Sequence, residues 1–342
     1  MLYENINYLN EDMIVGKDIL DPDTNRILLK SGTKLTSFYI RYLKDNGYKG
    51  IYIENENYKK VIIEDIIPEE LKNSSMKALK DLNIESVLEN ARSIVDHLFY
   101  KKNISFDSYN LKGDIYEHSI KVAEMSIVIG KTMGLNKDEL ISLAEAALLH
   151  DIGKCVKSKE NLKKLGYDGQ IGTYNEKLYP LYGYEILKNY SIIKATTKVG
   201  VLTHNIDENG KNNMMLNKNV QQHLFGKIIH VADIYDQIVT HTYHNKITSP
   251  SEATELLLGG CGTKFNGTIV KKFLKYIPIY SKGTKVELSN GMTGVVFENN
   301  HEIPLRPKVI IENGEIIDLS NLEYNNITIL DKNNEEIKKR AI

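Results

Sequence analysis

The pattern of apolar and polar residues changes twice along the 342-residue chain. Before about residue 60, short apolar runs are separated by turn residues such as Asp21-Pro22-Asp23, a pattern typical of strands and tight turns. From about 86 to 275, apolar residues recur every three or four positions, which predicts helices with one buried face. After about 277, short runs return with hairpin-type turns.

The predicted fold class is therefore mainly α, with an all-helical domain flanked by a small N-terminal α+β domain and a small C-terminal β segment. The boundaries that follow are 1–60 for the α+β domain, 61–85 for a linker, 86–276 for the helical domain, 277–330 for the β segment and 331–342 for a tail. The predicted helices are 36–46, 84–100, 113–133, 137–155, 175–189, 192–203, 220–240 and 266–276, with a further one beginning at Pro250. The predicted strands are 13–20, 26–30, 50–54, 283–288, 294–298, 308–312 and 316–319.

Composition and charge exclude several classes of protein. Apolar residues make up 42% and charged residues 26% of the chain, which is ordinary for a soluble globular protein. The net charge of -1 provides no basic field for a nucleic acid polymer. The two cysteines, Cys155 and Cys261, form no disulfide framework, and the N-terminus lacks the features of a signal peptide. No apolar run approaches the ~20 residues of a membrane span, so we expect a cytoplasmic protein.

The chemistry of the helical domain begins with His150-Asp151, at the end of an apolar run. In the predicted helix 137–155, apolar residues at spacings of three and four form one face, and His150 and Lys154 continue it. A buried charge is costly unless it is paired or bound to a metal. A His–Asp pair that satisfies itself in the core is the alternative interpretation.

Two further helices carry similar groups towards the interior. His118 lies on the apolar face of helix 113–133, with Asp114 one turn earlier, and Asp233 lies at the edge of the buried face of helix 220–240. Two imidazoles and two carboxylates suit a divalent metal such as Fe, Mn, Ni or Mg. A metal site of this kind can polarise a phosphoryl oxygen, and the ammonium of Lys154 can hold a phosphate.

The order His…His-Asp…Asp, with the run His-Asp-Ile-Gly-Lys at 150–154, resembles the HD superfamily of metal-dependent phosphohydrolases. The wider pattern is similar to the HD-GYP branch, the cyclic di-GMP phosphodiesterases. The stretches that carry this wider resemblance are 13–53, 230–236, 249–273 and 284–319. The resemblance implies metal ligands at His118, His150, Asp151 and Asp233, with His204 and Asp114 as additional ligands. It also implies contacts of Lys154 and Lys246 with substrate phosphate, and catalytic roles for Asp151 and Lys154.

The chain departs from the family pattern at the second metal and at the Gly-Tyr-Pro element. Tyr179 and Asn205 stand where the family has histidines, and a phenol with a pKa of about 10 is a poor ligand at neutral pH. The other departures are Ile206, Asn209, Asn212-Asn213-Met214, Thr242 and Asn245. The resemblance therefore favours one metal over two. The sequence leaves open whether other residues replace the missing ligands of the second metal, and the candidates are Asp207, Glu208, His223 and His244.

Two functions compete on this sequence. We favour a metal-dependent phosphodiesterase or phosphohydrolase with reduced activity, whose substrate is a cyclic dinucleotide or another small phosphoester. The alternative is a catalytically inactive metal- or nucleotide-binding signalling module that acts through a protein partner. The sequence leaves open whether the protein forms a homodimer. We also expect the polar loop 205–219 to be mobile in the free protein and to order on a ligand or partner, with Met214-Met215-Leu216 as its anchor.

Overall fold

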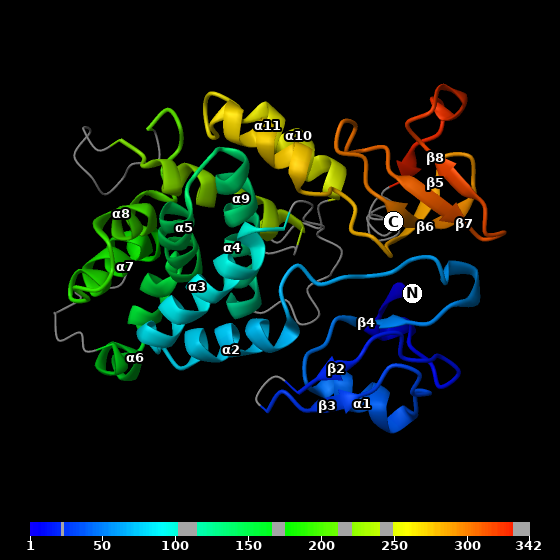
Figure 1. Ribbon diagram of the computed structural model, residues 1–342, viewed down its shortest axis with the longest axis horizontal. Helices are drawn as coiled ribbons and strands as arrows, with labels where there is room; N and C mark the ends of the chain where they lie inside the picture. The colour runs from blue at the N-terminus through cyan, green and yellow to red at the C-terminus, as the bar shows by residue number, and fades with distance from the viewer. Residues whose placement is uncertain (22–23, 102–114, 166–174, 211–220, 240–248, 331–342) are drawn as a thin grey trace, which may run out of the picture.

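The computed structural model describes residues 1–21, 24–101, 115–165, 175–210, 221–239 and 249–330. It shows a helical lobe on one side and two small strand-rich parts, from the two ends of the chain, on the other (Figure 1). The predicted fold class is confirmed: the protein is mainly α, with a small N-terminal α+β region and a small C-terminal β region.

The helical lobe is built around α4 (Ile115–Thr132), which packs against α5 (Lys137–Leu149) and α9 (Leu224–Val239). The start of α5 is fixed by a reciprocal cap, in which the side chains of Asn136 and Glu139 each accept a backbone N–H bond from the other residue. The remaining helices of this lobe are α2 (Glu69–Lys80), α3 (Ile84–Phe99), α6 (Lys159–Lys164), α7 (Tyr179–Lys188), α8 (Ala195–Thr203), α10 (Pro250–Gly259) and α11 (Gly267–Tyr276).

Small antiparallel sheets form at both ends of the described chain. In the N-terminal part, β1 (Leu2–Asn5) pairs with β4 (Gly50–Ile53), β2 (Ile19–Leu20) pairs with β3 (Ile27–Leu29), and α1 (Ser37–Asp45) packs beside them. The C-terminal sheet has the order β8-β7-β6-β5-β9. Its strands are β5 (Lys285–Leu288), β6 (Thr293–Glu298), β7 (Lys308–Ile311), β8 (Ile316–Asp318) and β9 (Ile329–Leu330).

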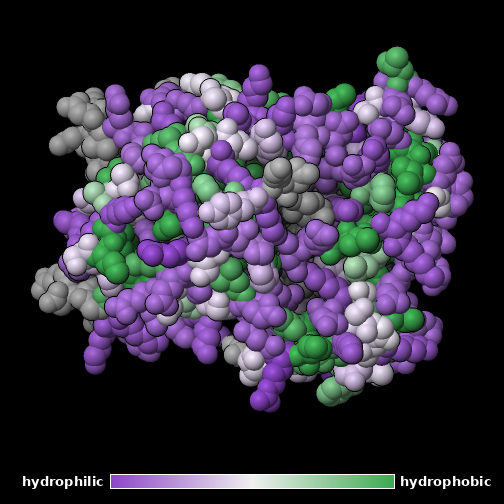
Figure 2. Space-filling view, in the orientation of Figure 1, coloured by the Kyte–Doolittle hydropathy of each residue, from purple (hydrophilic) through white to green (hydrophobic). Residues whose placement is uncertain are grey.

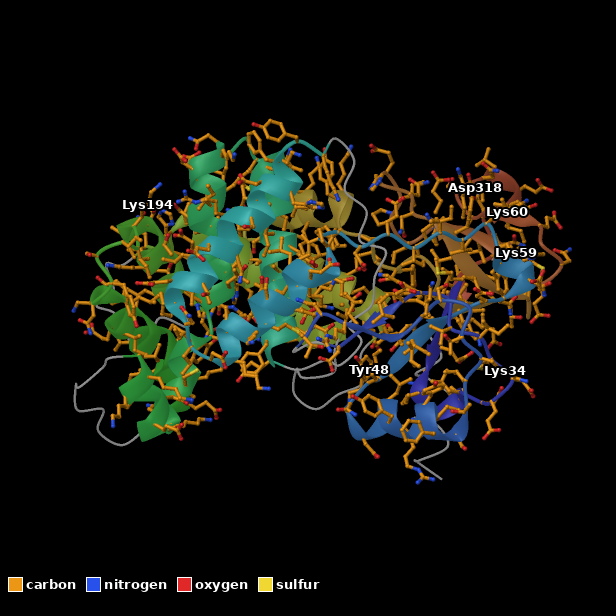
Figure 3. The ribbon with its side chains drawn as sticks, turned by 60° about the horizontal axis from the view of Figure 1, so that its bottom comes forward. Lys34, Tyr48, Lys59, Lys60, Lys194 and Asp318 are labelled. Carbon is orange, nitrogen blue, oxygen red and sulfur yellow. The ribbon has the colours of Figure 1, made fainter. Side chains whose placement is uncertain are left out.

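The C-terminal sheet joins the N-terminal part to the helical lobe. Successive residues of a strand point to opposite faces, and the buried residues of β6 and β7 divide accordingly. Val295 and Ile310 belong to a hydrophobic core shared with the N-terminal part, whereas Val296 and Val309 belong to the core of the helical lobe. An ion pair between Glu4 and Lys285 also links the two ends. Figure 3 shows this arrangement: Lys59 and Lys60 of the N-terminal part lie near Asp318 of the C-terminal sheet, and Lys194 of the helical lobe lies at the opposite end of the molecule.

The structure corrects the sequence prediction in several places, and it adds the short elements α6 and β9. The stretch 61–85, predicted as a linker, contains α2, whose Ala78 and Leu79 are buried in the core of the helical lobe. The N-terminal strand β1 was not predicted, and the predicted helix 137–155 ends at Leu149. The surface in Figure 2 is mostly hydrophilic, with apolar residues in small separate patches. Among the described residues, none of the helices combines the length and the apolar character that crossing a membrane requires.

Candidate metal centre

His150 and Asp151 occupy the turn that ends α5. His150 caps the helix, and a 3₁₀-helix over Ile152–Lys157 follows Asp151. Both side chains are buried, at 0% and 5% exposed. The chain turns here because it passes very close to α7: a Cβ atom on Gly153 would lie 1.8 Å from the carbonyl oxygen of Tyr179. Only glycine permits so close an approach of two backbone segments, so Gly153 sets the position of the turn.

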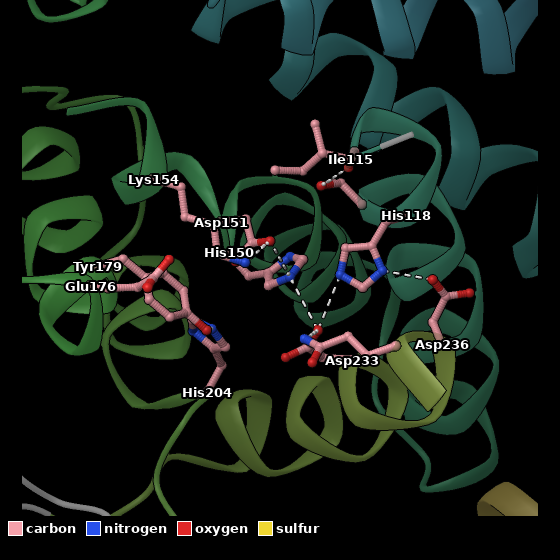
Figure 4. A network of polar contacts seen from close by, with 12 residues as sticks. Ile115, His118, His150, Asp151, Lys154, Glu176, Tyr179, His204, Asp233 and Asp236 are labelled. Carbon is pink, nitrogen blue, oxygen red and sulfur yellow. Dashed lines mark hydrogen bonds and ion pairs between the residues drawn. The ribbon is translucent and has the colours of Figure 1, made fainter. Parts of the chain in front are cut away.

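His118, from α4, faces two carboxylates of α9. Its Nε2 atom lies 3.1 Å from Oδ1 of Asp233, and its Nδ1 atom lies 2.6 Å from Oδ2 of Asp236. Nε2 of His150 lies 3.7 Å from the same Asp233 oxygen and 3.5 Å from Oδ2 of Asp151. The structure therefore brings His118, His150, Asp151 and Asp233 together from α4, the end of α5 and α9 (Figure 4).

The imidazoles share one anchoring pattern, in which Nδ1 is bonded and Nε2 faces the centre. Nδ1 of His118 bonds to the carboxylate of Asp236, Nδ1 of His150 lies 2.8 Å from the carbonyl oxygen of Ala147, and Nδ1 of His204 lies 2.7 Å from that of Val201. A carbonyl oxygen only accepts, so Nδ1 of His150 and of His204 carries the proton. Metal-bound histidines are held in this way, because the bond at one nitrogen fixes the tautomer and orientation of the other.

Several ligand atoms at this centre have no hydrogen bond among the described residues. They are Nε2 of His118, Nε2 of His150 and Oδ1 of Asp151, and all three are buried. One ligand atom from each of these three residues lies within 4.8 Å of the other two. Buried polar atoms are rarely left without a partner. Nitrogen and carboxylate oxygen donors converging in this way fit a divalent cation of the kind expected from the sequence, namely Fe, Mn, Ni or Mg.

The electrostatics of the centre also favour positive charge. Burial lowers the pKa of His118, but its contacts with Asp233 and Asp236 outweigh burial and raise that pKa to about 10. Burial raises the pKa of Asp233, but its contacts with His118 and His150 hold it well below the usual value. In the absence of an ion, a proton on His118 thus supplies the positive charge that the carboxylates stabilise, and a cation would take its place.

Lys154 and Tyr179 line the opposite side of the centre from Asp236 (Figure 4). Nζ of Lys154 lies 2.6 Å from Oδ2 of Asp151 and 4.7 Å from the centre of the Tyr179 ring. The lysine side chain is 33% exposed, so its ammonium group reaches both the buried carboxylate and solvent. The hydroxyl group of Tyr179 lies 3.0 Å from Nε2 of His204.

The residues left open as substitute ligands contact other groups than those of the centre, where the structure describes them. Oδ1 of Asp207 lies 3.6 Å from Nε2 of His230, and neither atom makes a hydrogen bond among the described residues. Glu208 forms an ion pair with Lys227 at 3.0 Å. Nδ1 of His223 accepts a bond from the backbone of Phe225. Three of the predicted site residues, Asp114, Lys246 and His244, lie outside the described residues.

The start of the loop 205–219 is packed against the stretch 263–266. Ile206 is 6% exposed, and the backbone N–H groups of Glu208 and Asn209 donate to carbonyl oxygens of Lys264 and Thr263. The side chain of Glu208 also accepts a bond from Asn266. The prediction of a mobile loop with a Met214-Met215-Leu216 anchor otherwise falls on residues that the structure does not describe.

Sequence reasoning did not identify Asp236 as a site residue. Its spacing of three from Asp233 on one helix places both carboxylates on the same face, and this was the available signal. What the spacing alone could not show is that the partner of Asp236 is His118, 118 positions earlier in the chain.

Comparisons with known proteins match the region that carries the centre. The family model described as HD domain matches residues 115–238, which contain every member of the centre. The chain is 26% identical over 227 residues to the cyclic di-GMP phosphodiesterase PdeB of Borreliella burgdorferi, which covers 65% of this chain and 58% of that protein. It is 27% identical over 196 residues to the cyclic di-GMP phosphodiesterase PA4108 of Pseudomonas aeruginosa, covering 57% and 47%. The matches thus span about half the length of these relatives.

Among solved structures, the HDG"Y"P protein Bd1817 of Bdellovibrio bacteriovorus aligns with 80% of this chain and 97% of its own, at 16% identity and a TM-score of 0.46. The resemblance to the HD superfamily that the sequence motifs carry is confirmed by the family match and by the two curated relatives.

Proposed function

We propose, from the premise that residues 115–238 form an HD domain, that the centre is a metal-dependent phosphohydrolase site with a single divalent ion. The observation that carries this proposal is the convergence of unbonded, buried ligand atoms from His118, His150 and Asp151 beside the carboxylate of Asp233. Four such groups would be an expensive way to stabilise a core without an ion, because each ionised group must be desolvated.

A divalent ion held by these residues would supply Lewis acidity, which polarises a phosphoryl oxygen and makes water more acidic. The protein's own part is to hold the ligands in place. Asp236 orients His118, and backbone carbonyl oxygens orient His150 and His204 through their Nδ1 protons. Cleavage of a phosphodiester forms one P–O bond to the oxygen of water and breaks one P–O ester bond, and the leaving oxygen takes up a proton.

We propose that Lys154 binds the phosphate group of the substrate. Its ammonium group is partly exposed beside Asp151, so it can meet a non-bridging phosphate oxygen that enters from solvent. We propose a cyclic dinucleotide of the cyclic di-GMP type as the substrate, because both curated relatives are named as cyclic di-GMP phosphodiesterases. Tyr179 and Asn205 supply no imidazole to a second ion, so we propose that the activity is lower than that of a two-metal enzyme.

Metal content and turnover of the purified full chain test this function. We expect about one equivalent of Mn²⁺ and slow, Mn²⁺-dependent opening of cyclic di-GMP to a linear dinucleotide. Asp151→Ala should abolish both. The matched control is Asp96→Ala, which removes an exposed carboxylate on α3 that pairs with Lys137. Full metal occupancy in Asp151→Ala would contradict the ligand assignment.

A non-catalytic signalling module is the second candidate, and the Tyr179–His204 contact favours it, because it engages an imidazole beside the centre. That candidate predicts bound Mn²⁺ without turnover of any phosphoester, together with a change in cyclic di-GMP affinity when Lys154 is replaced by alanine. Turnover that disappears in Asp151→Ala would exclude it.

A further inference from the structure

His204 is the imidazole at the centre whose Nε2 atom is already bonded. The side chain is fully buried at the end of α8, and its ring lies 5.1 Å from that of His150, centre to centre. Its Nδ1–H donates to the carbonyl oxygen of Val201. In a neutral ring, Nε2 then carries a lone pair that can bind either a metal or a hydrogen-bond donor. No polar contact other than those at its two ring nitrogens is needed to satisfy this buried ring, so the neutral tautomer with the proton on Nδ1 fits the site.

The lone pair of His204 accepts a hydrogen bond from Tyr179. The phenol oxygen lies 3.0 Å from Nε2, and because that nitrogen has no proton, the hydroxyl group is the donor. His118 and His150 differ from His204 in this respect, because their Nε2 atoms face the carboxylates of Asp233 and Asp151. Two of the imidazoles thus point at the other ligands of the centre, whereas the third is bonded to a neighbouring phenol.

Tyr179 is buried and closely packed in the position that this bond requires. It begins α7 and is 8% exposed, and its carbonyl oxygen rests directly against Gly153. The following turn of α7 is close as well, because a Cβ on Gly183 would lie 3.1 Å from the side chain of Val201. The backbones that carry Tyr179 and His204 are thus packed against each other. Nζ of Lys154 lies 4.7 Å from the centre of the phenol ring, an attractive cation–π contact that helps to hold the ring in place.

We infer that Tyr179 keeps His204 out of metal coordination by donating a hydrogen bond to its Nε2 atom, so that the centre binds one ion through His118, His150, Asp151 and Asp233. This inference rests on the proposed metal site. Tyr179 is a positioning residue in this role: it acts on the ion through His204 and sets the number of ligands. A phenol is suited to it, because it donates one bond and remains neutral at physiological pH.

A double-mutant cycle with Mn²⁺ as the probe tests the inference. The variants are His204→Gln, Tyr179→Phe and the two together, and the readouts are stoichiometry and dissociation constant. In the parent protein, His204→Gln should change the dissociation constant by less than about threefold, because His204 is not a ligand. In the Tyr179→Phe background, His204 is free to bind, and the same replacement should weaken binding by about tenfold or more, the effect typical of lost ligand-shell interactions.

The control for the loss of a hydroxyl group is Tyr182→Phe on the same helix. The hydroxyl group of Tyr182 accepts a bond from the backbone of Asn175 instead of contacting His204, so this variant should leave the effect of His204→Gln unchanged. Nitrogen NMR of the metal-free protein gives a second readout. It should show His204 with a protonated Nδ1 and a bonded Nε2, and Tyr179→Phe should shift the Nε2 resonance.

The outcomes separate this inference from the proposed function. Two bound ions, or loss of the single ion in His204→Gln alone, would overturn the inference and leave a metal-dependent site. No bound Mn²⁺ at millimolar concentration, in a folded protein, would overturn the proposed function and the inference together. An effect of His204→Gln that is the same with and without the Tyr179 hydroxyl would also overturn the inference.

Discussion

Replacing Asp236 with asparagine keeps the size of the side chain and removes its charge. Asp236 is 4% exposed and lies 2.6 Å from Nδ1 of His118. Charge-assisted hydrogen bonds are about twice as strong as neutral ones, and loss of such a partner typically weakens metal binding by about 10- to 100-fold. We expect Asp236→Asn to weaken Mn²⁺ binding to this extent at pH 8.5, which corresponds to about 1.4 to 2.8 kcal/mol.

The same substitution changes the competition between the ion and a proton. Burial lowers the pKa of His118, but Asp233 and Asp236 together raise it to about 10, so an ion must displace a proton at neutral pH. Removing the charge of Asp236 lowers that pKa and makes the proton easier to displace. The loss of affinity should therefore be smaller at pH 7 than at pH 8.5, and fewer protons should be released for each ion bound.

Titration calorimetry in two buffers of different ionisation enthalpy measures both quantities. The control is Asp96→Asn, which neutralises a half-exposed carboxylate on α3 and should leave the affinity within about twofold of the parent, as expected of an exposed charge. An Asp236→Asn variant that keeps its melting temperature and binds Mn²⁺ within twofold of the parent at both pH values would refute the role of Asp236 in holding His118.

Three further predictions concern stability. Gly153→Ala should lower the free energy of unfolding by about 3 kcal/mol, because the added Cβ would lie 1.8 Å from a backbone carbonyl oxygen of α7. A urea titration measures this loss, and Gly259→Ala is the control, because a Cβ added at Gly259 would have no atom within 4 Å. Lys72→Met should cost about 3 to 5 kcal/mol, since it removes the cation 2.5 Å from buried Glu117, and Lys72→Met/Glu117→Gln should recover part of that loss in the same titration. In the metal-free protein, the pKa of His118 is raised from 6.5 to about 10, so protonated His118 stabilises the folded state. This contribution to the free energy of unfolding should be fully present below about pH 6.5 and lost as the pH rises through about 10. Urea midpoints measured across this pH range check the sign, and His118→Gln should lack this pH dependence.

Helical periodicity gave the main helices of the lobe because each buries an apolar face. It placed His118 on the inward face of α4, and the structure puts that side chain against α9. Helix α2 escaped prediction because its buried residues include Asn73 and Ser75, so its inward face does not look apolar in the sequence. Strand β1 was not predicted because its pairing partner, β4, lies more than 40 residues away in the sequence, and only the folded chain brings the two strands together.

The ligand order could be found from the sequence, whereas the bonds that hold the ligands could not. Periodicity shows which face a residue occupies, but it does not show which nitrogen of a histidine is bonded or to what. At this centre that difference decides the chemistry. The Nδ1 atoms of His118 and His204 are both anchored, yet Nε2 of His118 faces the carboxylate of Asp233, whereas Nε2 of His204 is bonded to Tyr179. The ligand set therefore depends on Tyr179, whose position in the sequence shows only that a histidine of the family pattern is absent. It also depends on the close packing at Gly153, which fixes where the hydroxyl group of Tyr179 lies.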